Sequence, residues 1–331
     1  MPASSSKSLG RLVIGFWVFN LLVAFLAIGI WLLTSNQDVM AFFISSTPTP
    51  TASITSTSSL TYTSTPTSLP SETPTQTGTP TNTHTPTFTP TYTPTPVPFF
   101  EGPIVIGFSV ENRPLQVYRF GTGATERLIV AGMHGGSEFN TIQLADLLIA
   151  HLQEHPEIVP PGVTLYILRA LNPDGEAREH GFLGRVNANL VDLNRNWDAN
   201  WQKDWVRTGC WTLTYVTSGK RPGSEPETQA LMNFIQDHHF DALINYHSAV
   251  LGIFAGGLPP DDYSIRLAEA VAAVSTYPWP PIDTGCMYTG GFTDWADENN
   301  IAALDVELTD HTHTDFEMNL EILNVFLNWK R

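Results

Sequence analysis

Residues 127–133 (RLIVAGM) run directly into residues 134–138 (HGGSE), and this stretch decides how the rest of the chain is interpreted. The first part is a short aliphatic run, typical of a strand that is buried on both faces. The second part sets a histidine and a glutamate around two glycines. Residues 141–152 then carry apolar side chains near helical spacing. We therefore predict a buried strand, a polar turn and a helix in succession.

The same alternation continues toward the C-terminus. We predict further strands at residues 163–169, 241–246 and 301–308, and further helices at residues 225–239, 262–274 and 315–329. Strands that alternate with helices imply an α/β domain, here a three-layer α/β/α fold with a mixed, mainly parallel twisted sheet. In such sheets, ligand sites collect at the carboxyl ends of the strands.

The first 45 residues are apolar and precede this domain. Residues 12–33 form an apolar run of 22 residues, close to the ~20 that a membrane-spanning helix needs. Lys7 and Arg11 precede the run, so the positive-inside rule places the N-terminus in the cytoplasm. We predict a single-pass anchor in the cell membrane, with a span at about residues 12–34, that leaves the rest of the chain outside the cell.

Residues 46–98 are mostly Thr, Pro and Ser and repeat short motifs such as TPT. Such a segment has no apolar face to bury, so we predict a disordered, extended stalk of about 3.1 Å per residue. O-glycosylation of this stalk is a hypothesis. The remaining residues, 99–331, have a globular composition and form the predicted domain.

The chain carries a net charge of −16, which disfavours binding to nucleic acid. Cys210 and Cys286 are its only cysteines and no CxxC motif occurs, so neither a cysteine zinc site nor a redox motif is expected. Outside the cytoplasm these two cysteines could form one disulfide, and the sequence leaves that open.

Three predicted strand ends carry polar side chains that suit metal chemistry. His134 and Glu138 follow the first strand, and His247 follows another. Such side chains are normal zinc ligands, and a catalytic zinc has three of them plus water. Asp305 and Glu307 share one face of the last strand because strand side chains alternate. Carboxylates in an apolar strand are costly unless they are paired or functional, so this strand offers a general base.

Two segments between these strands are rich in Asn, Arg and Asp. Residues 171–175 (LNPDG) form a good turn by themselves. Residues 185–198 (RVNANLVDLNRNWD) suit neither a strand nor a helix. Together with the His and Glu pair, these motifs resemble the carboxypeptidase A family of zinc metallocarboxypeptidases. The resemblance runs to the C-terminus and includes residues 106–114 (IGFSVENRP) and 224–229 (SEPETQ).

The resemblance implies one zinc ion per chain, held by His134, Glu138 and His247. It also implies that Glu307 is the general base toward the attacking water and then the acid toward the leaving amine. Arg185 would stabilise the oxyanion. The family's metal pair is usually His-x-x-Glu, whereas three residues intervene here. We expect the two glycines of the turn to absorb the extra residue.

The resemblance further implies how the substrate is held. Asn194 and Arg195 would bind its terminal carboxylate, Arg195 as a bidentate fork, while Asp192 would orient His134. Tyr288 is the candidate for the mobile tyrosine that covers the substrate. The stretch from this tyrosine to the glycines that follow it is shorter than usual in the family.

The pocket for the terminal residue is expected beside Thr293 and Asp305. An aspartate that points into this pocket would favour C-terminal Lys or Arg, whereas one that pairs with a protein arginine would not. His311 and His313 follow the last strand, where we expect a solvated loop rather than a metal site.

These expectations describe a zinc-dependent carboxypeptidase that acts on peptide or protein C-termini outside the cell. We expect a monomer. Two alternatives remain open. One is a peptidase that cuts peptidoglycan stem peptides ending in a diamino acid. The other is a catalytically degenerate module that binds peptides at the cell surface.

Overall fold

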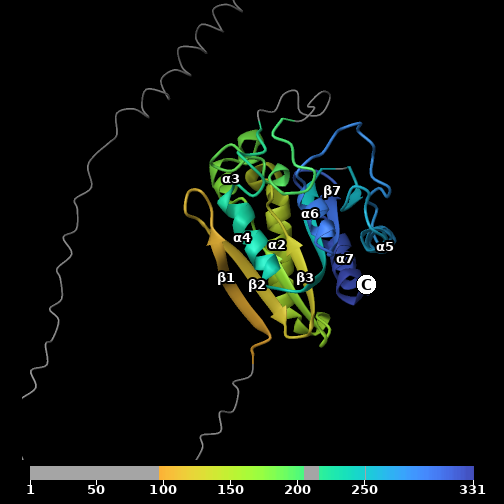
Figure 1. Ribbon diagram of the computed structural model, residues 1–331. Helices are drawn as coiled ribbons and strands as arrows, with labels where there is room; N and C mark the ends of the chain where they lie inside the picture. Colours follow the sequence, from red (N-terminus) through yellow and green to blue (C-terminus); the bar gives the residue numbers. More distant parts are fainter. Residues whose placement is uncertain (1–96, 205–215, 250) are drawn as a thin grey trace, which may run out of the picture. The chain divides into compact units, whose positions relative to one another are not determined.

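The structure, a computed structural model, describes residues 97–204, 216–249 and 251–331. Seven strands in these residues form one sheet, in the order β1-β2-β4-β3-β5-β7-β6 (Figure 1). Their bounds are β1 (Phe100–Phe108), β2 (Pro114–Gly121), β3 (Thr125–Val130), β4 (Val163–Leu168), β5 (Phe240–Ser248), β6 (Ile253–Ala255) and β7 (Ala302–Leu308).

The four central strands are parallel, and the outer strands are antiparallel to their neighbours. β4, β3, β5 and β7 pair in parallel, whereas β1, β2 and β6 each join antiparallel. The predicted mixed sheet is thus confirmed, but "mainly parallel" applies only to its centre. The hairpin of β1 and β2 has no counterpart among the predicted strands, because glycines and a proline interrupt the apolar pattern of β1.

The described residues also form six α-helices. Their bounds are α2 (Phe139–Glu154), α3 (Pro173–Arg178), α4 (Pro226–Gln236), α5 (Asp262–Ala272), α6 (Phe292–Glu298) and α7 (Phe316–Asn328). The four predicted helices correspond to α2, α4, α5 and α7. The short helices α3 and α6, with 6 and 7 residues, are too brief for an apolar period to indicate them.

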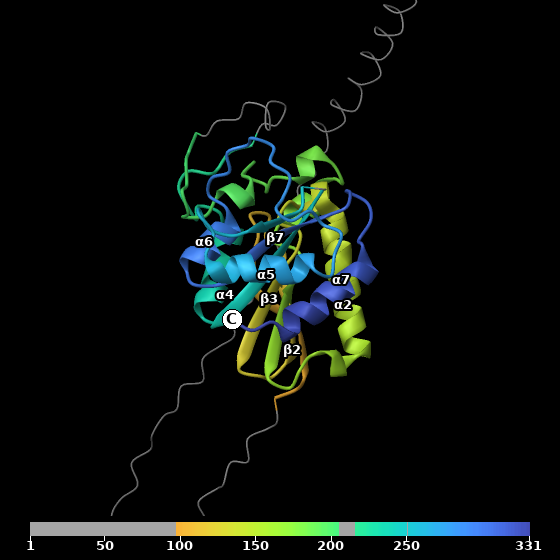
Figure 2. The same cartoon turned by 90° about the vertical axis from the view of Figure 1, so that its right-hand side faces the viewer.

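The alternating side chains of the strands build a hydrophobic core on each face of the sheet. In β3, Ile129 belongs to one core, and Leu128 and Val130 belong to the other. The first core also takes side chains from α2, α5 and α7, whereas the second takes them from α4 and α6. Helices therefore cover both faces, and α5 and α7 lie in front of the sheet in Figure 2.

This alternation decides where the polar side chains of β7 point. Leu304 and Val306 belong to the first core, and both are fully buried. Burial of such a side chain is worth about 1.5–3 kcal/mol. Asp305 and Glu307 alternate with these residues along the strand, so they face the opposite side of the sheet, where α4 and α6 pack. Hydrophobic burial on one face thus fixes two carboxylates on the other.

The predicted anchor, residues 1–45, and nearly all of the predicted stalk lie outside the described residues. Among the residues that the structure describes, no helix is long and apolar enough to cross a membrane. Cys286 is disulfide-bonded, while Cys210 lies outside the described residues.

Candidate metal centre

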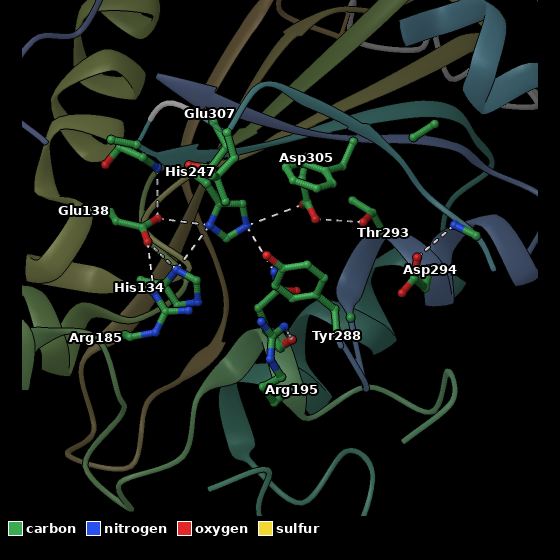
Figure 3. Close-up of a pocket in the computed structure, with 18 of the residues that line it drawn as sticks. His134, Glu138, Arg185, Arg195, His247, Tyr288, Thr293, Asp294, Asp305 and Glu307 are labelled. Carbon is green, nitrogen blue, oxygen red and sulfur yellow. Dashed lines mark hydrogen bonds and ion pairs between the residues drawn. The ribbon is translucent and has the colours of Figure 1, made fainter. Parts of the chain in front are cut away.

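Three buried side chains converge on one point at the carboxyl ends of β3 and β5 (Figure 3). His134 follows β3, Glu138 ends a short 3-10 turn (η1, Gly135–Glu138), and His247 lies in β5. His134 Nδ1 lies 2.7 Å from one carboxylate oxygen of Glu138, and His247 Nδ1 lies 3.0 Å from the other. The two Nδ1 atoms are 3.2 Å apart.

The turn brings Glu138, and not Ser137, to the histidines. Gly135 has a φ of 45°, in the left-handed region that favours glycine. A Cβ on Gly136 would lie 1.8 Å from the carbonyl oxygen of Glu179. Both glycines are therefore required by the conformation and the close packing of this turn. Within it, the extra residue between His134 and Glu138 is accommodated.

The donor set fits zinc. Two imidazole nitrogens and a carboxylate that face one another suit a cation between them, and three protein ligands leave one position for water or substrate. The resemblance noted from the sequence and the geometry agree on His134, Glu138 and His247 as the group that could hold the metal.

A second layer of contacts orients this group. Asp192 is fully buried, and one of its oxygens lies 3.0 Å from His134 Nε2. Arg185 donates from Nε to the other oxygen of Asp192 (3.0 Å) and from Nη1 to Glu138 (3.1 Å). A proton on His134 Nε2 is then held by Asp192, which leaves the Nδ1 lone pair facing the metal position.

Charges within the centre support the same assignment. Burial alone would raise the pKa of Glu138, but His134 and His247 hold it well below its usual range. Burial would lower the pKa of His247, but Glu138 and Asp305 raise it well above its usual range. In the absence of a cation, Glu138 is therefore charged and His247 carries a proton.

Glu307 lies beside the metal ligands on the neighbouring strand. β5 and β7 pair with His247 opposite Glu307 and Asn245 opposite Asp305. Burial, with a contribution from nearby Glu138, raises the pKa of Glu307 to about 8. Its Oε2 is buried and has no hydrogen-bond partner among the described residues. A strongly perturbed carboxylate in a cleft is typical of a general acid or base.

The predicted carboxylate clamp lies on the same pocket. Asn194 and Arg195 belong to a 3-10 turn (η4, Leu193–Arg195) and are both buried. Asn194 Oδ1 accepts from the backbone N–H of Phe292 at 2.9 Å, which fixes the amide. The guanidinium of Arg195 lies 5.2 Å from the ring centre of Tyr288. The shorter stretch before the glycines therefore still brings Tyr288 to the pocket that these residues line.

One wall of the pocket is acidic. Asp305 accepts from Asn245 Nδ2 at 2.7 Å and from the Thr293 hydroxyl at 3.0 Å. Asp294 lines the same wall, accepts from the backbone N–H of Gly257 at 2.9 Å, and has a pKa raised by burial. Asp305 thus lines the cavity, and within the described residues it contacts Asn245, Thr293 and His247.

Several pocket residues were not among the predicted site residues, and two of them, Ser248 and His311, form a hydrogen bond with each other. Ser248 follows His247 directly, and its backbone N–H donates to Glu138 at 3.2 Å. His311, expected in a solvated loop, is exposed yet also lines the pocket, with Nδ1 3.0 Å from the Ser248 hydroxyl. His313 is exposed and pairs with Asp310, as a loop residue would. The position of Ser248 beside a metal ligand was the available signal for that residue, whereas the position of His311 after the last strand had indicated only a solvated loop.

Comparison with known proteins decides the family. Residues 98–323 match the model of the zinc carboxypeptidase family. The chain belongs to this family. The carboxypeptidase A resemblance is thereby confirmed, and zinc is the metal that the family uses.

Two curated relatives illustrate the range of the family. Carboxypeptidase A4 of Mus musculus is 27% identical over 247 residues, which cover 64% of this chain and 58% of that protein. Murein peptide amidase A of Escherichia coli (strain K12) is 29% identical over 190 residues, which cover 54% of this chain and 69% of that protein. The chain therefore spans little more than half the length of the mouse relative.

A solved structure shows the same fold. Bovine thrombin-activatable fibrinolysis inhibitor, in complex with tick carboxypeptidase inhibitor, superposes with a TM-score of 0.55 and 21% sequence identity. The match covers 68% of this chain and 88% of the bovine chain. The α/β fold with a mixed sheet is thus the fold of known carboxypeptidase structures.

Proposed function

We propose that this chain is a zinc-dependent metallocarboxypeptidase that removes C-terminal residues from peptides, with a preference for basic ones. The observation that carries the proposal is a single pocket. It is lined by the metal group, a buried carboxylate at the next strand, and an arginine with an asparagine that suit a free carboxylate. Such a combination serves a hydrolase that acts at chain ends.

Catalysis would divide among residues already placed around the pocket. Zinc held by the three ligands supplies Lewis-acid activation of water and of the scissile carbonyl. Glu307 takes the proton of the attacking water and later passes it to the leaving amine. The guanidinium of Arg185, anchored on Asp192, donates to the oxygen on which negative charge develops.

The clamp explains why the enzyme would act on the last residue. Arg195 offers a planar fork of donors that matches a carboxylate, and Asn194 lies next to it on the same turn. An internal segment of a peptide has no carboxylate for this fork. Tyr288, whose ring lies near Arg195, would cover the bound residue.

The acidic wall supports the preference for C-terminal Lys or Arg. Asp305 and Asp294 both line the pocket, and Thr293 lies between them in contact with Asp305. An ammonium or guanidinium group there would gain a charge-assisted hydrogen bond to a carboxylate, whereas a phenyl ring could form none.

The first experiment measures zinc content and peptide hydrolysis together. The full-length protein should hold one zinc per chain and release C-terminal residues, and Glu307→Gln should keep the zinc but lose hydrolysis by at least a factor of about 100. Glu298→Gln, an exposed glutamate on α6, is the matched control and should behave like the parent. Protein without zinc after supplementation would favour the degenerate peptide-binding module instead.

A second candidate is a peptidase of cell-wall stem peptides. The similarity to murein peptide amidase A motivates it, and an acidic wall would also suit the amine of a diamino acid. Digestion of muropeptides beside ordinary peptides separates the two. Release from muropeptides alone would replace the first proposal with this one.

We also propose that the domain acts outside the cell on a membrane anchor, and that it is a monomer. The apolar run at residues 12–33, preceded by Lys7 and Arg11, supports the anchor. Membrane fractionation and protease treatment of intact cells test this topology. A protein recovered without membranes, or one protected from external protease, would contradict it.

A further inference from the structure

A hydrogen-bonded group beside the metal centre has no part in the mechanism above. It consists of Asn140 on α2, Ser248 at the end of β5, and His311 after β7. The Ser248 hydroxyl lies 2.9 Å from Asn140 Oδ1 and 3.0 Å from His311 Nδ1. Asn140 and Ser248 are both buried, whereas His311 is exposed and lines the pocket.

The orientation of the Asn140 amide fixes the direction of these bonds. Its Nδ2 donates to two backbone carbonyl oxygens, those of Asp310 (2.7 Å) and His313 (2.9 Å). Both protons of the amide are thereby used, and Oδ1 is left to face Ser248. Because an amide oxygen only accepts, the single hydroxyl proton of Ser248 points to Asn140.

The tautomer of His311 follows from this direction. With its own proton engaged, the Ser248 oxygen must accept from His311, so Nδ1 carries the hydrogen. In the neutral ring Nε2 is then unprotonated and can accept one hydrogen bond. The described residues provide no partner for Nε2, and the ring borders the substrate pocket.

The place of His311 along the pocket can be derived from the His247 ring. On the Nε2 side of that ring lie Asn194 (3.2 Å) and Asp305 (3.4 Å), next to the carboxylate clamp. On the Nδ1 side lies Glu138, which accepts from the backbone N–H of Ser248. Figure 3 shows Glu138 and Asp305 on opposite sides of His247. His311, bonded to Ser248, is therefore across the metal centre from the clamp.

We propose that His311 is a substrate-binding residue for the peptide chain upstream of the scissile bond. A peptide whose terminal carboxylate is at the clamp and whose scissile bond is at the metal centre must continue past Ser248. There His311 Nε2 accepts a hydrogen bond from a backbone N–H of the substrate. The inference rests on the proposed carboxypeptidase function and adds a requirement for an unsubstituted amide on the upstream side.

A chemical double-mutant cycle tests the proposal in the full-length, zinc-loaded protein. The substrates are matched peptides in which either of the two amides immediately upstream of the scissile bond carries N–H or N–CH3. At one of these positions, methylation should lower kcat/KM of the parent about five- to tenfold, the loss typical of one hydrogen bond. His311→Ala should lose a similar factor on the unmethylated peptide and nothing more on the methylated one.

A merely structural role for His311 would give a different pattern. His311→Ala would then lower kcat/KM of methylated and unmethylated peptides by equal factors at both positions, and that result would overturn the proposal. His313→Ala, an exposed histidine in the same loop, is the matched control and should retain the full effect of methylation.

Failure of the proposed function can be told apart from failure of this inference. If the parent releases no residue from any peptide, the same cycle is measured as Kd by calorimetry, with the zinc-loaded Glu307→Gln variant as the parent. If the effects of methylation and of His311→Ala on binding affinity are non-additive, His311 is still supported as a binding residue of the pocket. Additive effects on the affinity would reject it.

Discussion

At the scale of single residues, Asp192 connects a candidate metal ligand to Arg185. It is fully buried and touches both His134 and Arg185. Burial alone would raise its pKa, but Arg185 and His134 hold it well below the usual range, so it stays charged. One carboxylate thus fixes the tautomer of a metal ligand and the position of the guanidinium.

Asp192→Ala should weaken zinc binding about 10- to 100-fold, because His134 loses the acceptor that orients its ring. Competition with a chromogenic chelator measures the affinity. Asp198→Ala, an exposed aspartate in the same segment, should leave it unchanged. Thermal unfolding of the zinc-free forms shows that the variants are folded, and an unaltered affinity in folded Asp192→Ala would contradict the assigned role.

Asp305→Asn should lower the preference for C-terminal Lys over Phe about 10- to 100-fold, the loss expected when a charge-assisted hydrogen bond is removed. The readout is the ratio of kcat/KM for two peptides that differ only in the last residue. The ratio is informative because Asp305 also lies 3.4 Å from His247, so the variant will affect both substrates through the metal centre. A parent enzyme that releases Phe as well as Lys would remove the basis of the proposed preference.

At the scale of secondary structure, the elements that were predicted correctly are those whose buried apolar side chains follow a regular pattern in the sequence. The aliphatic runs of β3, β4, β5 and β7 and the periodic helices α2, α4, α5 and α7 are where the patterns placed them. β1, β2 and β6 are edge or near-edge strands, with weaker patterns. α3 and α6 have only 6 and 7 residues, too few for an apolar period to indicate a helix.

The residues of the candidate site also divide into those that the sequence pattern indicated and those that it did not. His134, Glu138, His247 and Glu307 could be found because they follow or interrupt buried strands. His311 also follows a buried strand, but the sequence indicated only a solvated loop, because its place in the pocket depends on a hydrogen bond to Ser248, 63 positions away in the chain. Contacts of this kind arise from the tertiary fold and leave no signal in spacing.

The packing of α7 on the first core predicts a stability effect. Leu323 is 2% exposed, so Leu323→Ala should lower the free energy of unfolding by about 2–5 kcal/mol, measured by urea denaturation. Leu147→Ala makes the same change at a side chain of α2 that is 41% exposed. That control substitution should lower the free energy of unfolding by about 0.5 kcal/mol or less. Equal losses would mean that α7 does not pack on the sheet as described.

At the scale of the whole molecule, the metal centre links zinc binding to pH. In the zinc-free protein, Glu138 and Asp305 outweigh burial and raise the pKa of His247 well above its usual range. His247 is then protonated at neutral pH, and zinc must displace that proton. The apparent affinity should therefore rise with pH until the raised pKa is passed, and should level off above it.

Zinc titrations at several pH values measure this dependence. Below the raised pKa the apparent association constant should change about tenfold per pH unit for each proton displaced. Proton release, followed by calorimetry in buffers of different ionisation enthalpy, gives an independent count. An affinity that does not change between pH 6 and 8 would show that His247 is already neutral in the zinc-free protein.

The pairing of β5 with β7 has a consequence beyond holding the sheet together. His247 faces Glu307 and Asn245 faces Asp305. A slip of one residue would turn both carboxylates into the first core, where burial opposes it. A slip of two residues would keep every side chain on its own face, yet, depending on its direction, it would place Asp305 opposite His247 or Glu307 opposite Asn245. The register of β5 against β7 therefore decides which carboxylate lies beside His247, where we propose the general base, and which one lies at the wall of the pocket, where we propose that the terminal side chain binds.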